Sequence, residues 1–195
     1  MHRPHDSSTA SNHARLGLLA SALCLFTAVA CAEPIDVHVE KTGDLIIVDV
    51  KATVAAKPSI VWGVLTDYDH MVDFISALKT SRVISRDGNV LQVAQAGDAQ
   101  IGMFHFSFDT VRSVTLVPQR EVQSHLIRGD FKRSDFTTKV TSEGANTIIT
   151  NHGEYIPDRW VPPWIGPSAI RQQTEKQYAE LIAEMMKRQS MGNAQ

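Results

Sequence analysis

The sequence predicts an α+β fold in which one curved antiparallel sheet wraps around a long C-terminal helix. In the stretch 167–189, apolar residues recur at helical spacing on one face and charged residues occupy most of the other. Nearly everything before this stretch reads as short strands. Short turns between the later strands require antiparallel neighbours. A helix of that length, about 33 Å long, needs a broad apolar surface, which a single sheet supplies.

Local signals set the order of the elements. Pro58 and Pro167 suit first helical turns, where a missing N–H costs nothing. Asp67 is expected to cap a short helix, and Asp87-Gly88 marks a hairpin turn. The predicted elements are strands 35–40 and 45–53, two short helices at 59–65 and 67–75, strands 81–85, 90–94, 102–117, 121–128, 132–141 and 146–156, and helix 167–189.

Residues 1–32 have the pattern of a cleaved secretory signal peptide. A basic, polar start ends at Arg15, an apolar run follows over 16–30, and Ala30-Cys31-Ala32 provides small residues for cleavage. The alternatives are an uncleaved anchor and a lipoprotein attached through Cys31. We therefore expect an exported protein, in a bacterial periplasm, whose mature part is one domain over 33–195.

The composition limits the kinds of function. The chain has 195 residues, a formal net charge of −2 and two cysteines, Cys24 and Cys31, both inside the predicted leader. This charge balance gives no electrostatic case for binding nucleic acid. Cleavage after Ala32 would remove both thiols. No two histidines of the mature part stand at a metal-ligand spacing. The sequence therefore predicts no metal, no cofactor and no nucleic-acid partner.

The run Val54-Ala55-Ala56-Lys57-Pro58-Ser59-Ile60-Val61-Trp62-Gly63-Val64-Leu65-Thr66-Asp67-Tyr68-Asp69 resembles the opening of the START-like, helix-grip (SRPBCC) superfamily. It is most similar to the polyketide cyclase/dehydrase and coenzyme Q-binding branch. The resemblance also takes in Phe74 and the final helix after a proline-rich stretch. It implies a helix-grip fold with an apolar cavity between the sheet and the last helix. It provides no catalytic residue, because this superfold hosts transporters, cyclases and hydrolases alike.

Candidate ligand-binding residues come from the aromatic and apolar positions that would face this cavity. Alternation places Phe104, Phe106 and Phe108 on one face of a strand, and His105 on the other. Asn151 and Tyr155 share a face with Ile149, so they could orient a polar group of an apolar ligand. Trp160 and Trp164 form either a plug at the helix start or a gate that touches a membrane transiently. The full predicted set is Phe74, Phe104, Phe106, Phe108, Ile149, Asn151, Tyr155, Trp164, Ile170 and Tyr178.

Ordinary structural roles are expected for several residues whose types could also suggest a catalytic or binding site. Asp67 and Asp69 resemble a carboxylate pair, but helix capping explains an acid at this place. The strand arginines are expected on a solvated outer face, as most such charges are. An arginine that pointed inward would be a functional clue, because burying it unpaired is costly. Arg112, Arg120, Arg128 and Arg133 are the candidates.

The leading functional prediction is a non-enzymatic module that holds a hydrophobic small molecule such as a lipid, an isoprenoid or a quinone-like compound. The second hypothesis is a cyclase or dehydratase acting on a polyketide-like substrate. Its acid and base would be Tyr155 with Asn151, or an inward His105 with Asp109. The third is an envelope interaction module with a filled core and no ligand.

Overall fold

The computed structural model describes residues 35–101, 104–158 and 166–193, with the side chains of Ile101 and Phe104 excepted. The predicted leader and both tryptophans of the segment 159–165 lie outside these residues. The element order agrees with the sequence analysis. In order, the elements are β1 (Asp36–Thr42), β2 (Leu45–Val54), α1 (Pro58–Leu65), the 3₁₀ helix η1 (Tyr68–Asp73), β3 (Leu78–Asp87), β4 (Val90–Ile101), β5 (Phe104–Val117), β6 (Glu121–Gly129), β7 (Phe131–Glu143), β8 (Asn146–Pro157) and α2 (Pro167–Asn193).

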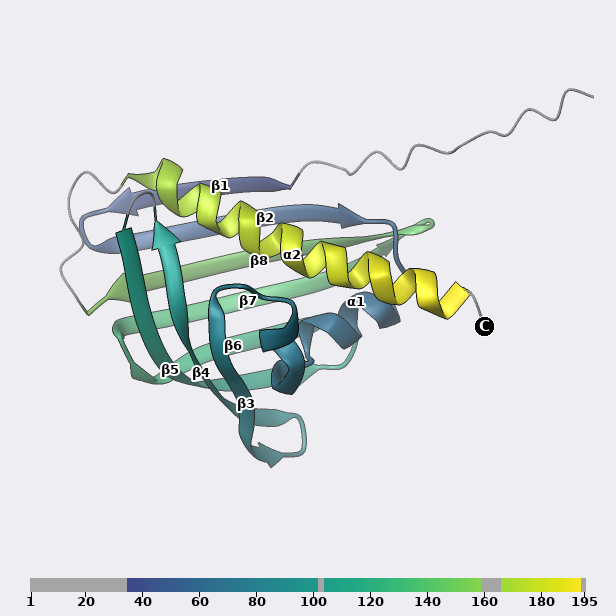
Figure 1. Cartoon of the computed structure of the whole chain (residues 1–195), viewed down its shortest axis with the longest axis horizontal. Helices are drawn as coiled ribbons and strands as arrows, with labels where there is room; N and C mark the ends of the chain where they lie inside the picture. The colour runs from purple at the N-terminus through teal and green to yellow at the C-terminus, as the bar shows by residue number, and fades with distance from the viewer. Residues whose placement is uncertain (1–34, 102–103, 159–165, 194–195) are drawn as a thin grey trace, which may run out of the picture. The chain divides into compact units, whose positions relative to one another are not determined.

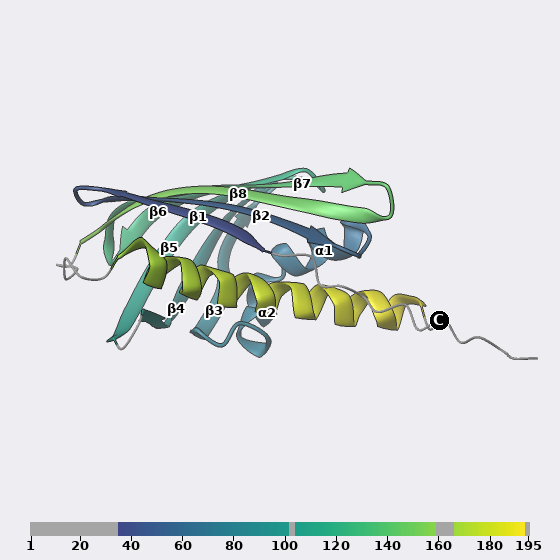
Figure 2. The same cartoon turned by 90° about the horizontal axis from the view of Figure 1, so that it is seen from above.

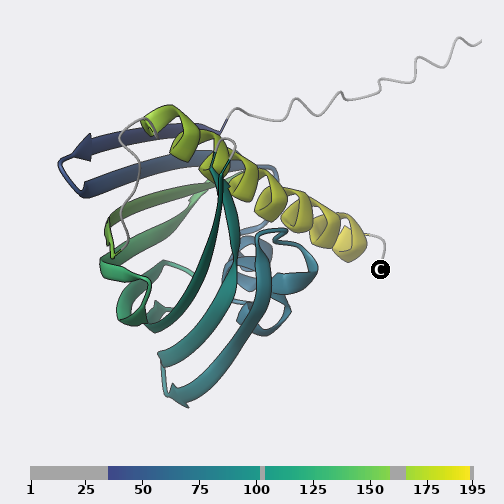
Figure 3. The same cartoon turned by 60° about the vertical axis from the view of Figure 1, so that its left-hand side comes forward.

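The strands of the described chain form one antiparallel sheet with the order β1-β2-β8-β7-β6-β5-β4-β3 (Figure 1). The pairing of β2 with β8, from Ile46 opposite Tyr155 to Val54 opposite Thr147, joins the two ends of the domain's sequence. The sheet bends so that β3, β4 and β5 turn away from the plane of β1 and β2, and α2 lies on the concave side (Figure 3). The predicted helix-grip fold is confirmed.

Strand β2 shows why one face of the sheet is buried. Its buried apolar residues occupy every second position, so their side chains all point to the concave side. The residues between them, such as Asp49 and Lys51, are exposed. Fully burying one valine or isoleucine side chain contributes about 1.5–3 kcal/mol. The concave set is at most 4% exposed and comprises Ile46, Val48, Val50, Ala52 and Val54.

Helix α2 runs along the concave side of the sheet and contacts β1, β2, β4 and α1 (Figure 2). Tyr178, Leu181 and Met185 are buried at helical spacing and belong to the main core cluster. The predicted apolar face of this helix is confirmed. The helix ends at Asn193, beyond the predicted end at residue 189.

The apolar core is divided into two clusters. The main cluster joins α1 and α2 to β1, β2, β7 and β8. The second cluster lies where η1 packs over the other half of the sheet, and it contains Tyr68, Met71, Leu91, Val93, Val114 and Val122. Trp62, Phe74 and Leu78 are partly buried and border both clusters. Together, α1 and η1 pack the concave face at one end of the strands.

Strand β4 extends beyond its predicted end. The prediction stopped at residue 94, and residues 95–100 carry no large apolar side chain. Backbone pairing with β5 nevertheless continues to Ile101, with Gly97 opposite Phe108. Neighbouring strands therefore decide the structure of this segment, rather than its own side chains.

Candidate functional site

The concave face presents the alternating residues that the sequence predicted. Asn151 and Ile149 are buried and Tyr155 is half-buried there, whereas His152 lies on the outer face. The Nδ1 atom of His152 is 2.7 Å from a carboxylate oxygen of Asp49, also on the outer face. The predicted faces of β8 are therefore confirmed.

Some predicted site residues are part of the packed core. Ile149, Ile170 and Tyr178 are at most 9% exposed and belong to the main cluster, and Phe74 packs against both clusters. Their packing roles are established by these contacts. A contact with a ligand stays a prediction for all four.

Phe106 and Phe108 of β5 occupy the concave face as predicted. Phe106 and Phe108 are half-buried, while His105 and Asp109 are exposed on the opposite face. The hypothesis of an inward His105–Asp109 pair is therefore wrong. Phe104 is described for its backbone alone, and Trp164 lies outside the described residues.

Arg112 is the concave-face residue that the sequence analysis did not select. Its Nε donates to the Ser124 hydroxyl at 2.6 Å, and its Nη1 donates to the Ser134 hydroxyl at 3.1 Å. Its guanidinium also lies over the ring of Phe136, 5.1 Å from the centroid. Arg112 follows Phe106 and Phe108 at even spacing along β5, so strand alternation places all three on one face. This spacing is the signal in the sequence that could have identified Arg112. The other three arginines considered with it are exposed.

An aromatic series continues from Arg112 across the concave face. The ring of Phe136 stacks on that of Tyr155 at 6.2 Å, and Phe131 meets Tyr155 edge-on at 5.7 Å. Gly153 makes this possible, because a Cβ there would overlap the Phe136 ring. Thr138 donates its hydroxyl to the Asn151 side-chain oxygen at 2.8 Å. A cation, three aromatic rings and several neutral polar groups thus share one region of the concave face.

Seclusion from water changes the acid–base properties of this region. Burial lowers the pKa of Arg112 to about 10, so the guanidinium is still charged at neutral pH. Burial raises the pKa of Tyr155 to about 12, so its phenol stays protonated near pH 7. Arg112, Phe136 and Tyr155 nevertheless keep partial solvent exposure. They are surrounded by protein without being packed as tightly as the core clusters.

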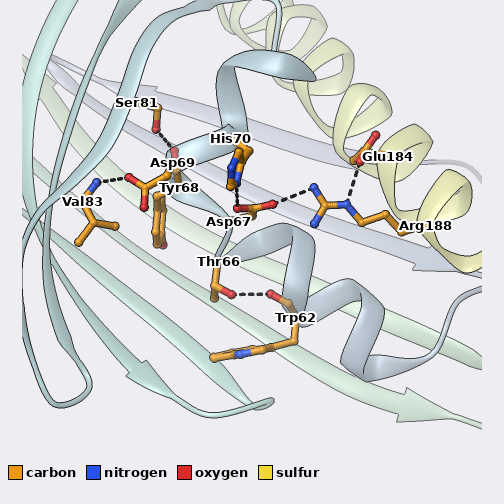
Figure 4. Close-up of polar contacts among 10 residues, drawn as sticks. All are labelled: Trp62, Thr66, Asp67, Tyr68, Asp69, His70, Ser81, Val83, Glu184 and Arg188. Atoms are coloured by element: carbon orange, nitrogen blue, oxygen red, sulfur yellow. Dashed lines mark hydrogen bonds and ion pairs between the residues drawn. The ribbon is translucent and has the colours of Figure 1, made fainter. Parts of the chain in front are cut away.

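Residues 66–69, the end of the run 54–69 that resembles the START-like superfamily, form a polar network that attaches η1 to its neighbours (Figure 4). Asp67 does not cap η1. Its carboxylate instead accepts a hydrogen bond from Arg188 of α2 at 2.8 Å and lies 2.6 Å from Nδ1 of His70. Asp69 accepts from the backbone N–H of Val83 at 2.7 Å. The capping prediction was wrong, and both carboxylates hold structure together rather than forming a catalytic pair.

The Asp67 network should make stability depend on pH. Burial raises the pKa of the Asp67 carboxyl, but hydrogen bonds from His70 and Arg188 outweigh it and the net pKa is lowered. The stability that the ionised Asp67 carboxylate contributes is present above its unfolded pKa of about 3.9, and it is lost as the pH falls through the folded pKa. The hydrogen bond to Asp67 raises the pKa of His70, so that contribution is present below pH 6.5 and is lost as pH rises through the folded pKa.

We therefore expect Asp67→Asn to lower the melting temperature more at pH 5.5 than at pH 8.5. Thermal unfolding followed by circular dichroism at both pH values measures the difference. Asp87→Asn, which removes an exposed carboxylate at the end of β3, is the control and should show no such pH dependence. An equal loss for Asp67→Asn at both pH values would contradict the assigned ionic contact with His70.

Two surface hollows lie on the described part of the chain, the first of them on the outer face. One of about 530 Å³ lies over β1, β2, β7 and β8, and one of about 430 Å³ is lined mainly by β3 and β4. In the described part of the chain, no helix combines the length and apolarity that crossing a membrane requires. Nor do its His, Cys, Asp and Glu side chains gather in groups of three or more that could hold a metal ion.

The family model for polyketide cyclase/dehydrase and lipid transport proteins matches residues 54–152. The chain belongs to this family. The match runs from the end of β2 into β8 and includes the opening motif, Arg112 and Phe136. It confirms the resemblance seen in the sequence. It does not distinguish the coenzyme Q-binding branch, which stays a prediction. No curated protein matches the chain.

Solved structures similar to this family member share its fold at low sequence identity. A STAR-related lipid transfer protein from Xanthomonas axonopodis has a TM-score of 0.64 and 12% identity, over 80% of this chain and 96% of that one. A START superfamily protein from Mycobacterium smegmatis has a TM-score of 0.57 and 15% identity, over 74% of this chain and 97% of that one. The Zhui aromatase/cyclase from Streptomyces sp. R1128 has a TM-score of 0.57 and 14% identity, over 74% of this chain and 95% of that one. These likenesses show the fold alone.

Proposed function

We propose that this protein binds a hydrophobic small molecule between α2 and the concave face of the sheet. The observation that carries the proposal is the uneven packing of that face. Two apolar clusters fill much of the face, whereas Phe106, Phe108, Phe136 and Tyr155 keep partial exposure. Aromatic walls with a few polar groups are typical of small-molecule sites.

The energetics of such binding are adequate without covalent chemistry. Removing about 300 Å² of apolar ligand surface from water at roughly 25 cal/mol per Å² contributes about 7 kcal/mol before the costs of association. The family description includes lipid transport, and one structural neighbour is named as a lipid transfer protein. Both support carriage of a lipid, an isoprenoid or a quinone-like compound.

A cyclase or dehydratase activity is the second candidate, because the family and one neighbour include cyclases. Its acid–base pair would have to be Tyr155 with Asn151. The side-chain oxygen of Asn151 accepts from Thr138, and the raised pKa of Tyr155 makes this phenol a weak acid at neutral pH. These contacts favour carriage over catalysis.

Export is part of the proposal and rests on the sequence of residues 1–32. If this leader is cleaved after Ala32, the mature protein from its own host begins at Glu33. N-terminal sequencing of the protein from a periplasmic fraction tests this. An intact N-terminus in the cytoplasmic fraction would contradict export, while a lipid-modified Cys31 would favour the lipoprotein alternative.

Native mass spectrometry of the protein purified from its own host tests the binding proposal. We expect an added mass of a lipid-sized molecule that disappears when the protein is denatured. Extraction with organic solvent would then identify the molecule. A protein that carries only its own mass, and associates only with other proteins, would favour the envelope interaction module.

A further inference from the structure

The guanidinium of Arg112 uses only part of its hydrogen-bonding capacity, and what we infer from it rests on the proposed function. A guanidinium has five N–H donors. Three contacts involve them: the Ser124 hydroxyl, the Ser134 hydroxyl, and the Ser134 carbonyl at 3.4 Å from Nη2. All three acceptors are neutral. One N–H on Nη1 and one on Nη2 therefore have no acceptor among these contacts.

The other arginines with buried or structural roles have carboxylate partners. Arg133 pairs with Asp135 and Glu154, and Arg188 pairs with Asp67 and Glu184. Within the part of the chain that the structure describes, Arg112 has no carboxylate at ion-pair distance. Asp135, the residue next to Ser134, binds Arg133 and His125 on the outer face instead.

A secluded cation without an anion is unfavourable, and an anionic ligand would offset that cost. The planar fork of a guanidinium matches the two oxygens of a carboxylate. Ser124 and Ser134 fix the orientation of the group, and the face of Phe136 supports its plane. The two remaining N–H groups are donors that the oxygens of a ligand carboxylate can accept from.

We propose that Arg112, held by Ser124 and Ser134, binds the carboxylate of an acidic amphiphile. The apolar body of the ligand lies along the rings of Phe136 and Tyr155. The ligand class is therefore a long-chain or polycyclic carboxylic acid rather than a neutral hydrocarbon. The carboxylate completes the set of acceptors around Arg112 and compensates its charge inside the protein.

Fluorescence titration with cis-parinaric acid and with its methyl ester tests the proposal, because the two probes differ only in the charged group. At pH 7.5 we expect the wild-type protein to bind the acid at least about 10-fold more tightly, since a hydrogen-bonded charge contributes an effect of this order. Arg112→Gln should bring the two affinities within about 2-fold. Arg133→Gln, which removes an exposed arginine from the outer face, should leave the ratio unchanged.

Each result decides the matter. Equal affinity of the wild-type protein for acid and ester, or an acid preference that persists in Arg112→Gln, overturns the carboxylate inference and leaves the binding proposal standing. Failure to bind either probe overturns the inference, and an empty native mass spectrum then overturns the proposed function as well. If Arg112→Gln does not fold, the acid-to-ester ratio of the wild-type protein decides alone.

Discussion

Replacing Met185 by alanine is expected to lower the free energy of unfolding by about 2–5 kcal/mol. Met185 is fully buried in α2 and belongs to the main core cluster with residues of β2 and β8. Alanine would remove most of its contacts and leave a cavity that the surrounding strands cannot close. Urea unfolding followed by tryptophan fluorescence and circular dichroism measures the loss.

Met191 provides the matched control on the same helix. It is 52% exposed, so Met191→Ala should change stability by no more than about 0.5 kcal/mol. The contrast between the two methionines tests whether the sheet grips α2 through its predicted apolar face. Similar small effects for both would mean that the helix contributes little to the folded domain.

Replacing Gly97 by alanine is the second large expected effect. Gly97 lies in β4, where a Cβ would overlap the backbone oxygen of Ala77. That oxygen also accepts a hydrogen bond from the N–H of Asp98 at 2.9 Å. Because backbone atoms cannot rotate away as a side chain can, the variant must shift β3 against β4. We expect a loss of about 1–3 kcal/mol in the free energy of unfolding.

Gly63 is the control for this substitution. It is exposed in the short helix α1, and a Cβ added there would meet no atom within 4 Å. Gly63→Ala should therefore stabilise the protein, by up to about 1 kcal/mol, because alanine favours the helix. Opposite signs for the two glycines are the expected result in chemical denaturation. A neutral Gly97→Ala would show that β3 and β4 can separate without cost.

The parts of the fold that the sequence predicted are those governed by local periodicity. Alternation placed Asn151 and Tyr155 on the concave face, and helical spacing placed Tyr178 and Met185 against the sheet. Both patterns depend on side chains a few residues apart. They are visible in the sequence because burial of one face requires them.

The wrong capping prediction has the opposite cause, since it involves a partner distant in sequence. Asp67 was assigned to capping, a local role, whereas its carboxylate binds Arg188, 121 residues away. The close approach of Ala77 to Gly97 is likewise tertiary. No local sequence pattern around Asp67 or Gly97 predicts these contacts.

The candidate site lies between these two cases. Alternation places Arg112 on the same face as Phe106 and Phe108, so its inward position was accessible from the sequence. The expectation that strand arginines are solvated prevented that conclusion. Its contacts with Ser124, Ser134 and Phe136 depend on the pairing of β5, β6 and β7, which only the structure reveals.

The central claim is that an apolar ligand lies against the concave face, and intermolecular nuclear Overhauser effects test it most directly. The measurement uses isotopically labelled protein with palmitate as the probe. The account predicts effects between the methylene protons of palmitate and the ring protons of Phe136 and Tyr155. Effects confined to outer-face residues such as His152 and Thr150, with none to these rings, would contradict it.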